Sequence, residues 1–201
     1  VTFHDQKPGL TELDADVTVA DIGIPEVAER FVERGDLLRL SRDPSSHKGD
    51  HGELLVIGGG PYTGAPALSA RAAFRAGADL VRVACPSSVA REVQSFSEGI
   101  IVRPFTGDLL EPGHVDQLLD RAVEHDVRAV IDADALQVVP EVDTDATLLC
   151  TPHQGELRKM GGETDDDWER RADLVADYAA DVDQTLLVKG AYDVISDGEI
   201  G

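Results

Sequence analysis

The sequence has few basic residues and no long hydrophobic run, and each shortage excludes a class of protein. Only 18 of 201 residues are Lys or Arg against 39 Asp and Glu, which gives a formal net charge of -21. Such a chain has no basic stripe to neutralise phosphates, so we expect no nucleic-acid partner. No apolar run approaches the ~20 residues of a membrane span, and no signal-like segment opens the chain. We therefore expect a cytoplasmic protein without a membrane partner.

Lysine is the scarcest of the charged residues, with four in the chain: Lys7, Lys48, Lys159 and Lys189. An acidic surface with little lysine keeps a protein hydrated in strong salt, where repulsion between charges is screened. We therefore predict a salt-adapted protein from a halophile, and the alternative is an ordinary acidic cytosolic protein. The free energy of unfolding, measured by urea titration, should be higher in molar salt than in dilute salt. Greater stability in dilute salt would contradict the prediction.

Cysteine and aromatic residues are also rare, at two cysteines and 4% aromatics. Cys85 and Cys150 each end an apolar run, and no metal-ligand spacing surrounds them. We expect both to be reduced and buried as small hydrophobic side chains, with a catalytic thiol as the alternative. The core should then consist mainly of Val, Leu, Ile and Ala.

The chain is organised around the stretch from Leu54 to Ala78. Its apolar run 54–57 predicts a strand buried on both faces, and three glycines at 58–60 interrupt the pattern. Helix-forming residues then run from Ala65 to a C-terminal cap at Gly77. A strand, a glycine-rich loop and a helix N-terminus can face an anion. The alternative is an ordinary tight turn between a strand and a helix.

Strand and helix patterns alternate along the rest of the chain. Apolar strands are predicted at 17–20, 80–85, 100–102 and 127–131. A short helix or turn is predicted at 26–34, and helices are predicted at 87–94 after a Ser87-Ser88 cap and at 112–125. This alternation predicts a three-layer α/β fold with a mostly parallel central sheet.

Polar residues follow three of the apolar strands directly. Ile131 is followed by Asp132-Ala133-Asp134, Cys150 by the segment 151–156 and Val188 by the segment 189–193. Ligands of such folds bind beyond the carboxyl ends of the strands, so we expect a site there. Taken singly, Asp134 could merely cap a helix and Lys189 could be a strand-end charge.

Five motifs occur in one order that resembles a known family. They are His47-Lys48-Gly49, Leu55-Val56-Ile57-Gly58-Gly59 with Gly64-Ala65-Pro66, Asp132-Ala133-Asp134-Ala135-Leu136, Thr151-Pro152-His153 with Gly155-Glu156, and Val188-Lys189-Gly190-Ala191. The set resembles the ADP/ATP-dependent NAD(P)H-hydrate dehydratases, whose domain is carbohydrate-kinase-like. Residues 1–25 are similar to the end of the NAD(P)H-hydrate epimerase domain that often precedes it. We therefore divide the chain into an upstream tail and linker, 1–40, and a dehydratase domain, 41–201.

The resemblance implies a ribokinase-like fold and a coenzyme-repair reaction. ADP or ATP, with Mg²⁺, would phosphorylate the ring hydroxyl of hydrated NADH or NADPH, and phosphate would then leave. Phosphate is a much better leaving group than hydroxide, so this chemistry suits a kinase scaffold. By position, Ala65 and His153 would contact the hydrated coenzyme. The adenine nucleotide would lie along Lys189, Gly190, Ala191, Tyr192 and Asp193.

Further roles are our own assignments or are left open by the sequence. Asp134 and Glu156 are candidates for positioning magnesium or water, and we expect a homo-oligomer. The sequence departs from the family twice: one strand–helix unit is missing, which we place at the junction 125–127, and the chain stops before the Gly-Gly-Thr-Gly-Asp segment that carries the family's catalytic aspartate. We expect that segments have been omitted from the chain; a chain that truly lacks them should not catalyse. The alternatives are a vitamin or sugar kinase and a non-catalytic nucleotide-binding module.

Overall fold

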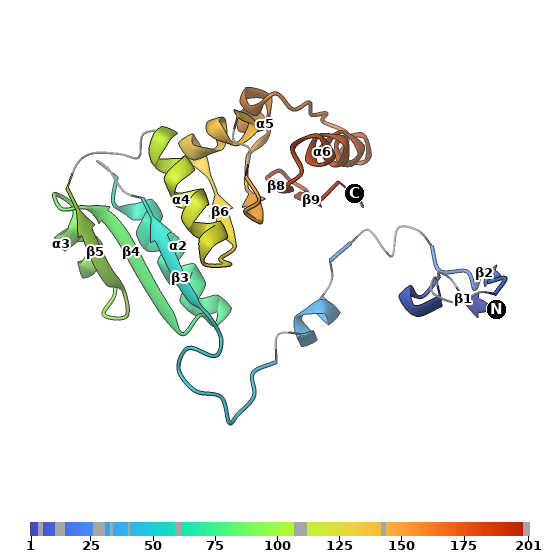
Figure 1. The fold of residues 1–201 in the computed structure, drawn as a ribbon, viewed down its shortest axis with the longest axis horizontal. Coiled ribbons are helices and arrows are strands. Elements are labelled where there is room, and N and C mark those ends of the chain that lie inside the picture. Colours follow the sequence, from blue (N-terminus) through green and yellow to red (C-terminus); the bar gives the residue numbers. More distant parts are fainter. Residues whose placement is uncertain are drawn as a thin grey trace. The chain divides into compact units, whose positions relative to one another are not determined.

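The computed structural model describes residues 1–3, 6–10, 15–25, 31–32, 34–39, 41–58, 62–106, 112–141 and 144–198. The chain divides into two compact units, Val1–Asp43 and Pro44–Gly201 (Figure 1). In the first unit, β1 (Thr2–Phe3) pairs in parallel with β2 (Val19–Ala20), which confirms a strand within 17–20. The unit also holds two short 3₁₀ helices, η1 (Pro8–Leu10) and η2 (Arg34–Arg39). Most of the predicted helix 26–34 lies outside the described residues.

The second unit begins with a three-stranded parallel sheet in the order β3-β4-β5. Its strands are β3 (Glu53–Ile57), β4 (Leu80–Pro86) and β5 (Ile101–Phe105). Parallel strands need a crossover, and α2 (Gly64–Ala76) and α3 (Ala90–Ser95) provide it. Helix α2 ends as predicted at Gly77, whose φ of 107° places it in the left-handed region.

Both helices pack on one face of this sheet. The alternating residues Val81, Val83 and Cys85 of β4 are fully buried against Ala70 of α2 and Val93 of α3. Burial raises the pKa of the Cys85 thiol, as expected for a small hydrophobic side chain rather than a reactive one.

Two local predictions for this region were wrong. Strand β3 is not buried on both faces, because it lies at an edge of its sheet, and Leu54 and Leu55 are 36% and 52% exposed. The predicted Ser87-Ser88 cap does not form either. Helix α3 starts after Val89 without a side-chain cap, because the Ser87 hydroxyl donates instead to the Phe105 carbonyl at 2.9 Å.

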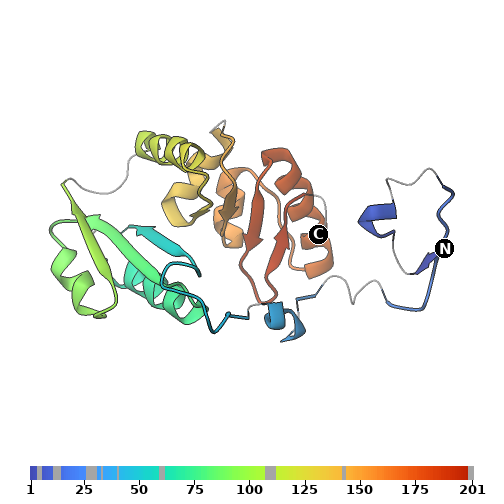
Figure 2. The same cartoon turned by 60° about the horizontal axis from the view of Figure 1, so that its bottom comes forward.

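The remainder of the second unit contains a four-stranded sheet in the order β6-β7-β8-β9, together with four helices (Figure 2). The strands are β6 (Ala129–Ile131), β7 (Leu148–Cys150), β8 (Thr185–Val188) and β9 (Val194–Ser196). The first three are parallel and β9 returns antiparallel to β8. The helices are α4 (Pro112–Glu124), η3 (Ala133–Glu141), α5 (Gln154–Met160) and α6 (Trp168–Val182).

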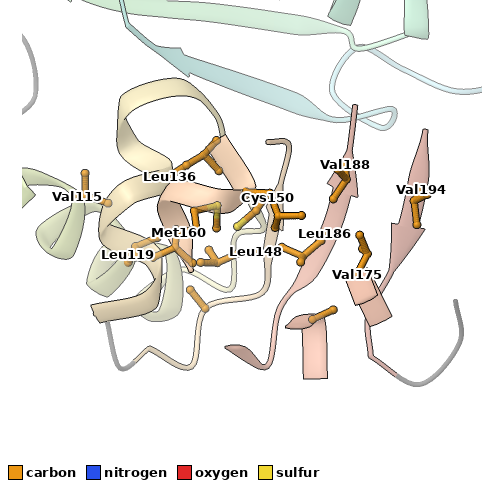
Figure 3. Close-up of a cluster of buried hydrophobic side chains, with 14 of the residues drawn as sticks. Val115, Leu119, Leu136, Leu148, Cys150, Met160, Val175, Leu186, Val188 and Val194 are labelled. Atoms are coloured by element: carbon orange, nitrogen blue, oxygen red, sulfur yellow. The ribbon is translucent and has the colours of Figure 1, made fainter. Parts of the chain in front are cut away.

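One hydrophobic cluster joins these elements (Figure 3). Leu148 and Cys150 of β7 and Leu186 and Val188 of β8 are its central members, all at most 2% exposed. Helices α4, η3, α5 and α6 contribute most of the rest, and Val115 and Leu119 occupy the predicted apolar face of α4. Burial raises the pKa of the Cys150 thiol to about 11, which argues against the catalytic-thiol alternative.

The α/β class and the mostly parallel strand arrangement are confirmed, but the described strands of the second unit pair into two sheets instead of one. Among the described strands, none pairs with both sheets. The chain passes from α4 to β6 through Asp126, which has a left-handed φ of 51°. This is the junction at which the missing strand–helix unit is expected. Within the described parts of the chain, no helix is long and apolar enough to cross a membrane.

Candidate functional site

Three neighbouring strand ends bring together the charged residues of the candidate site. Asp132 follows β6, His153 lies three residues beyond β7, and Lys189 follows β8. Pairing continues past β7 and β8, since the Lys189 amide donates to the Pro152 carbonyl at 2.8 Å. These residues therefore lie at one edge of one sheet, as expected from the sequence; their roles stay predictions.

Lys189 is the cation at the centre of this cluster. Its ammonium donates to Asp132 Oδ1 at 2.9 Å and lies 3.9 Å from Glu156 Oε2. The side chains of Lys189 and Asp132 are 41% and 55% exposed, so the pair is open to solvent and to a ligand. One lysine thus faces two carboxylates, which orients its ammonium group at the end of the sheet.

Asp132 is held in its ionised form by its neighbours. Partial burial by itself would raise the pKa of this carboxyl, but hydrogen bonds from Lys189, the Ala133 amide and Thr151, with the Lys189 charge, outweigh burial and leave the pKa below its ordinary value. Ala133 has a left-handed φ of 57°, which is unusual for a residue with a Cβ. Backbone strain of this kind concentrates at functional sites.

The lowered pKa of Asp132 predicts a pH-dependent contribution to stability. Because this pKa is lower in the folded than in the unfolded chain, the stabilisation is fully present above the unfolded value of about 3.9 and is lost as the pH falls through the folded value. Urea unfolding should be measured from about pH 6 to about pH 3. The free energy of unfolding of wild type should exceed that of Asp132→Asn near pH 6, and this difference should shrink in the acid range. A difference between the two proteins that does not change with pH would contradict this.

His153 forms the N-terminal cap of α5 with its side chain. Its Nδ1 accepts from the amides of Gly155 at 2.9 Å and Glu156 at 3.1 Å, while Glu156 Oε2 accepts from the His153 amide at 2.8 Å. This reciprocal capping box satisfies otherwise unpaired helix donors. Because Nδ1 is an acceptor, the proton of the neutral ring is on Nε2. Nε2 lies 3.5 Å from Glu156 Oε1, and the His153 side chain is 58% exposed, so a ligand can reach this edge of the ring.

Gly155 leaves room for this ring position. A Cβ at residue 155 would lie 2.9 Å from His153 Cε1 and 3.1 Å from Nδ1. We expect Gly155→Ala to displace the ring and to lower the free energy of unfolding by about 1 kcal/mol through the lost cap. Urea unfolding measures the loss, and the NMR signals of the His153 ring report its displacement. Gly64→Ala, in the first turn of α2 with no atom near the added Cβ, is the control. An equal effect of both substitutions would contradict the prediction.

The predicted nucleotide-binding residues form the loop of a β-hairpin. Residues 189–193 connect β8 to β9, and Val188 pairs with Val194 at the base of the loop. The Gly190 amide donates to Asp193 Oδ1 at 2.9 Å, which closes the loop internally. The Tyr192 ring, 62% exposed, lies 6.4 Å from the ring of Trp168 between centroids. The loop therefore carries both the lysine of the cluster and an exposed aromatic side chain.

The other predicted site residues lie in different surroundings. Asp134 is exposed in the first turn of η3, and within the described part of the chain it makes no side-chain hydrogen bond or ion pair with the Lys189 cluster. Ala65 is exposed at the start of α2, beside the three-stranded sheet, and its role stays a prediction. Sequence reasoning chose Asp134 and missed Asp132 as a site residue. Its position directly after the strand was the signal, because that residue is first to reach the sheet edge.

The described residues offer no ready-made metal site, since no group of three or more His, Cys, Asp or Glu among them could hold an ion. Asp132 and Glu156 both face Lys189. Magnesium commonly uses one or two carboxylates together with substrate phosphates. The donor set therefore fits an ion that arrives on a nucleotide better than one held by the protein alone.

Comparison with known proteins finds relatives over most of the chain. Residues 54–200 match the family model described as NAD(P)H-hydrate dehydratase. The chain is 37% identical over 239 residues to the bifunctional NAD(P)H-hydrate repair enzyme Nnr of Methanothermobacter thermautotrophicus, covering 99% of this chain and 46% of the relative. It is 35% identical to the ADP-dependent (S)-NAD(P)H-hydrate dehydratase of Cenarchaeum symbiosum, covering 86% of this chain and 71% of the relative.

The alignment to the first relative is longer than the chain of 201 residues, so that relative has residues without a counterpart here. The chain spans about half the length of the bifunctional relatives. These relatives and the Cenarchaeum protein belong to the family that the sequence motifs indicate.

Solved structures support the fold. A ribokinase-like superfamily protein of Enterococcus faecalis superposes with a TM-score of 0.66 at 18% identity, covering 83% of this chain and 68% of that one. The ADP/ATP-dependent NAD(P)H-hydrate dehydratase of Bacillus subtilis, co-crystallised with ATP/Mg²⁺, gives a TM-score of 0.67 at 23% identity, covering 80% and 65%. The ribokinase-like fold expected from the sequence is confirmed, and the chain belongs to the NAD(P)H-hydrate dehydratase family.

Proposed function

We propose that this chain is the dehydratase part of an NAD(P)H-hydrate repair protein. It would return hydrated NADH or NADPH to the intact coenzyme at the expense of ADP or ATP. The observation that carries the proposal is the convergence of Asp132, His153, Glu156 and Lys189 at three adjacent strand ends within the region that matches the family.

The geometry supports the proposed roles of Lys189 and His153, and the other roles rest on the sequence. The Lys189 ammonium, already oriented by two carboxylates, would bind a phosphate of the nucleotide, and the loop 189–193 would follow the nucleotide. His153 would offer its Nε2–H to the hydrated coenzyme, because Nδ1 is occupied by the α5 cap. Ala65 would contact the same coenzyme. Magnesium, when bound, would neutralise phosphate charge, and Glu156 and Asp134 would orient it or a water molecule.

Residues 1–40 would be the tail of an upstream epimerase domain and its linker. Support comes from the bifunctional relatives, whose alignments cover nearly the whole chain, and from the unit boundary at Asp43. The cytoplasmic location and the homo-oligomer stay predictions.

The test is to incubate the purified chain with hydrated NADH, magnesium and ADP or ATP in high salt. Recovery of dihydronicotinamide absorbance would establish the reaction, with an intact mass measured on the same sample. No recovery at a mass near 21.5 kDa would indicate a binding module without catalysis. No recovery at a larger mass would favour a small-molecule kinase.

A second candidate function, the non-catalytic nucleotide-binding module, is favoured by two observations. The described strands of the second unit form two separate sheets, and the first relative carries residues that this chain lacks. Binding of ADP without turnover of hydrated NADH or NADPH would support this candidate.

A further inference from the structure

Arg171 lies beneath the hairpin loop and is buried, with only 4% of its surface exposed. Its Nη1 donates to the Asp165 carbonyl and its Nη2 to the Tyr192 carbonyl, both at 3.0 Å. It therefore ties the segment before α6 to the loop 189–193. Burying a charged side chain costs free energy, so packing alone does not explain an arginine at this position.

Among the described residues, the charge of Arg171 has no anionic partner, since no carboxylate there lies within ion-pair distance of its guanidinium. The adjacent Asp165 carboxylate pairs instead with Arg170, at 3.4 Å. The Arg171 Nε is buried without a hydrogen-bond partner. An uncompensated cation under a loop makes the electrostatic potential of that loop more positive.

The loop rests directly on this guanidinium. A Cβ at Gly190 would lie 3.0 Å from the Tyr192 carbonyl oxygen and 3.6 Å from Arg171 Nη2. The loop is therefore held at Tyr192 by Arg171 and at Gly190 by Asp193. Trp168, one turn before Arg171 on α6, contacts the Tyr192 ring on the same side.

We infer that Arg171 is a positioning residue for nucleotide binding. It fixes the backbone of the loop 189–193 through the Tyr192 carbonyl, and its unpaired charge increases the affinity of the loop for the phosphates of a nucleoside di- or triphosphate. The inference rests on the proposed nucleotide site and adds to it a residue that does not itself touch the nucleotide.

The test uses Trp168, the only tryptophan of the chain, as a reporter beside the loop. Arg171→Met removes the charge and both donors, and Arg171→Lys keeps the charge. Arg170→Met is the matched control, because Arg170 is the adjacent residue and its side chain is 73% exposed. Mg·ADP is titrated into each protein in high salt, with its Kd measured by calorimetry, and Trp168 emission is recorded without ligand.

We expect Arg171→Met to raise the Kd for Mg·ADP by about tenfold or more, and Arg171→Lys by about threefold. Emission of Trp168 without ligand should change in Arg171→Met, whereas Arg170→Met should match wild type in both measurements. A purely structural role would lower the urea midpoint and leave the Kd of the folded protein unchanged, which would overturn the inference.

An equal loss of affinity in Arg170→Met would also overturn it. If Arg171→Met does not unfold cooperatively, it is not properly folded, and the test then uses Arg171→Lys. A Kd for Mg·ADP in Arg171→Lys equal to that of wild type would overturn the inference. Absence of Mg·ADP binding by wild type would overturn the proposed nucleotide site and this inference together. Binding by wild type with no change in the Arg171 variants would overturn only the inference.

Discussion

Replacing Lys189 by Met should raise the Kd for Mg·ADP by about 100-fold, the largest functional effect that we expect from one substitution. The lysine contributes the ammonium group that faces both Asp132 and Glu156. Without it, two carboxylates remain at the place where an anionic phosphate would bind. The lost attraction and the new repulsion act in the same direction. Calorimetric titration in high salt measures the change.

Lys159→Met is the matched control for this experiment, because Lys159 is exposed in the last turn of α5. It loses the same charge from the same kind of side chain, and its Kd should stay close to that of wild type. The pKa of Asp132 should rise in Lys189→Met, since its lysine hydrogen bond and charge are among the causes that lower it. Equal affinities of Lys189→Met and wild type would refute the role of Lys189.

Leu186→Ala should lower the free energy of unfolding by about 2–5 kcal/mol, the largest expected effect on stability. Leu186 is fully buried in the middle of the four-stranded sheet, within the cluster that joins β7, β8 and the surrounding helices (Figure 3). Its truncation removes apolar contacts and leaves a cavity that closely packed neighbours cannot fill. Domains are commonly stable by only about 5–15 kcal/mol, so the variant should unfold at a much lower urea concentration.

Leu68→Ala makes the same chemical change on an exposed face of α2, where the leucine is 67% exposed. It should change the free energy of unfolding by less than about 0.5 kcal/mol. If the two substitutions cost the same, the four-stranded sheet does not have the closely packed core that Figure 3 shows.

Much of the candidate site could be predicted because it depends on one rule of parallel sheets. Three apolar strands followed by polar residues place those residues at one edge, whatever their separation along the chain. Asp132 and Lys189 are 57 residues apart and yet hydrogen bonded. What the rule leaves open is which residue after a strand points to the shared edge. Asp132 does so, whereas Asp134 has already turned into η3.

Arg171 is a part of the site that could not be predicted from the sequence. It is one of two adjacent arginines, and no sequence pattern distinguishes it from Arg170. Burial of one and exposure of the other depend on which side of α6 faces the loop 189–193. That contact joins segments about 20 residues apart and exists only after β8 and β9 have paired beside α6.

The sequence determined the α/β class, the approximate strands and helices, the buried state of both cysteines and the family, because apolar periodicity and ordered motifs are local properties of the chain. The tertiary structure decided what depends on neighbours in space. Strand β3 has the composition of a buried strand, yet Leu54 and Leu55 are exposed because no described strand covers the free edge of β3. The ion cluster around Lys189, the ring position of His153 and the burial of Arg171 likewise arise only where separate elements meet.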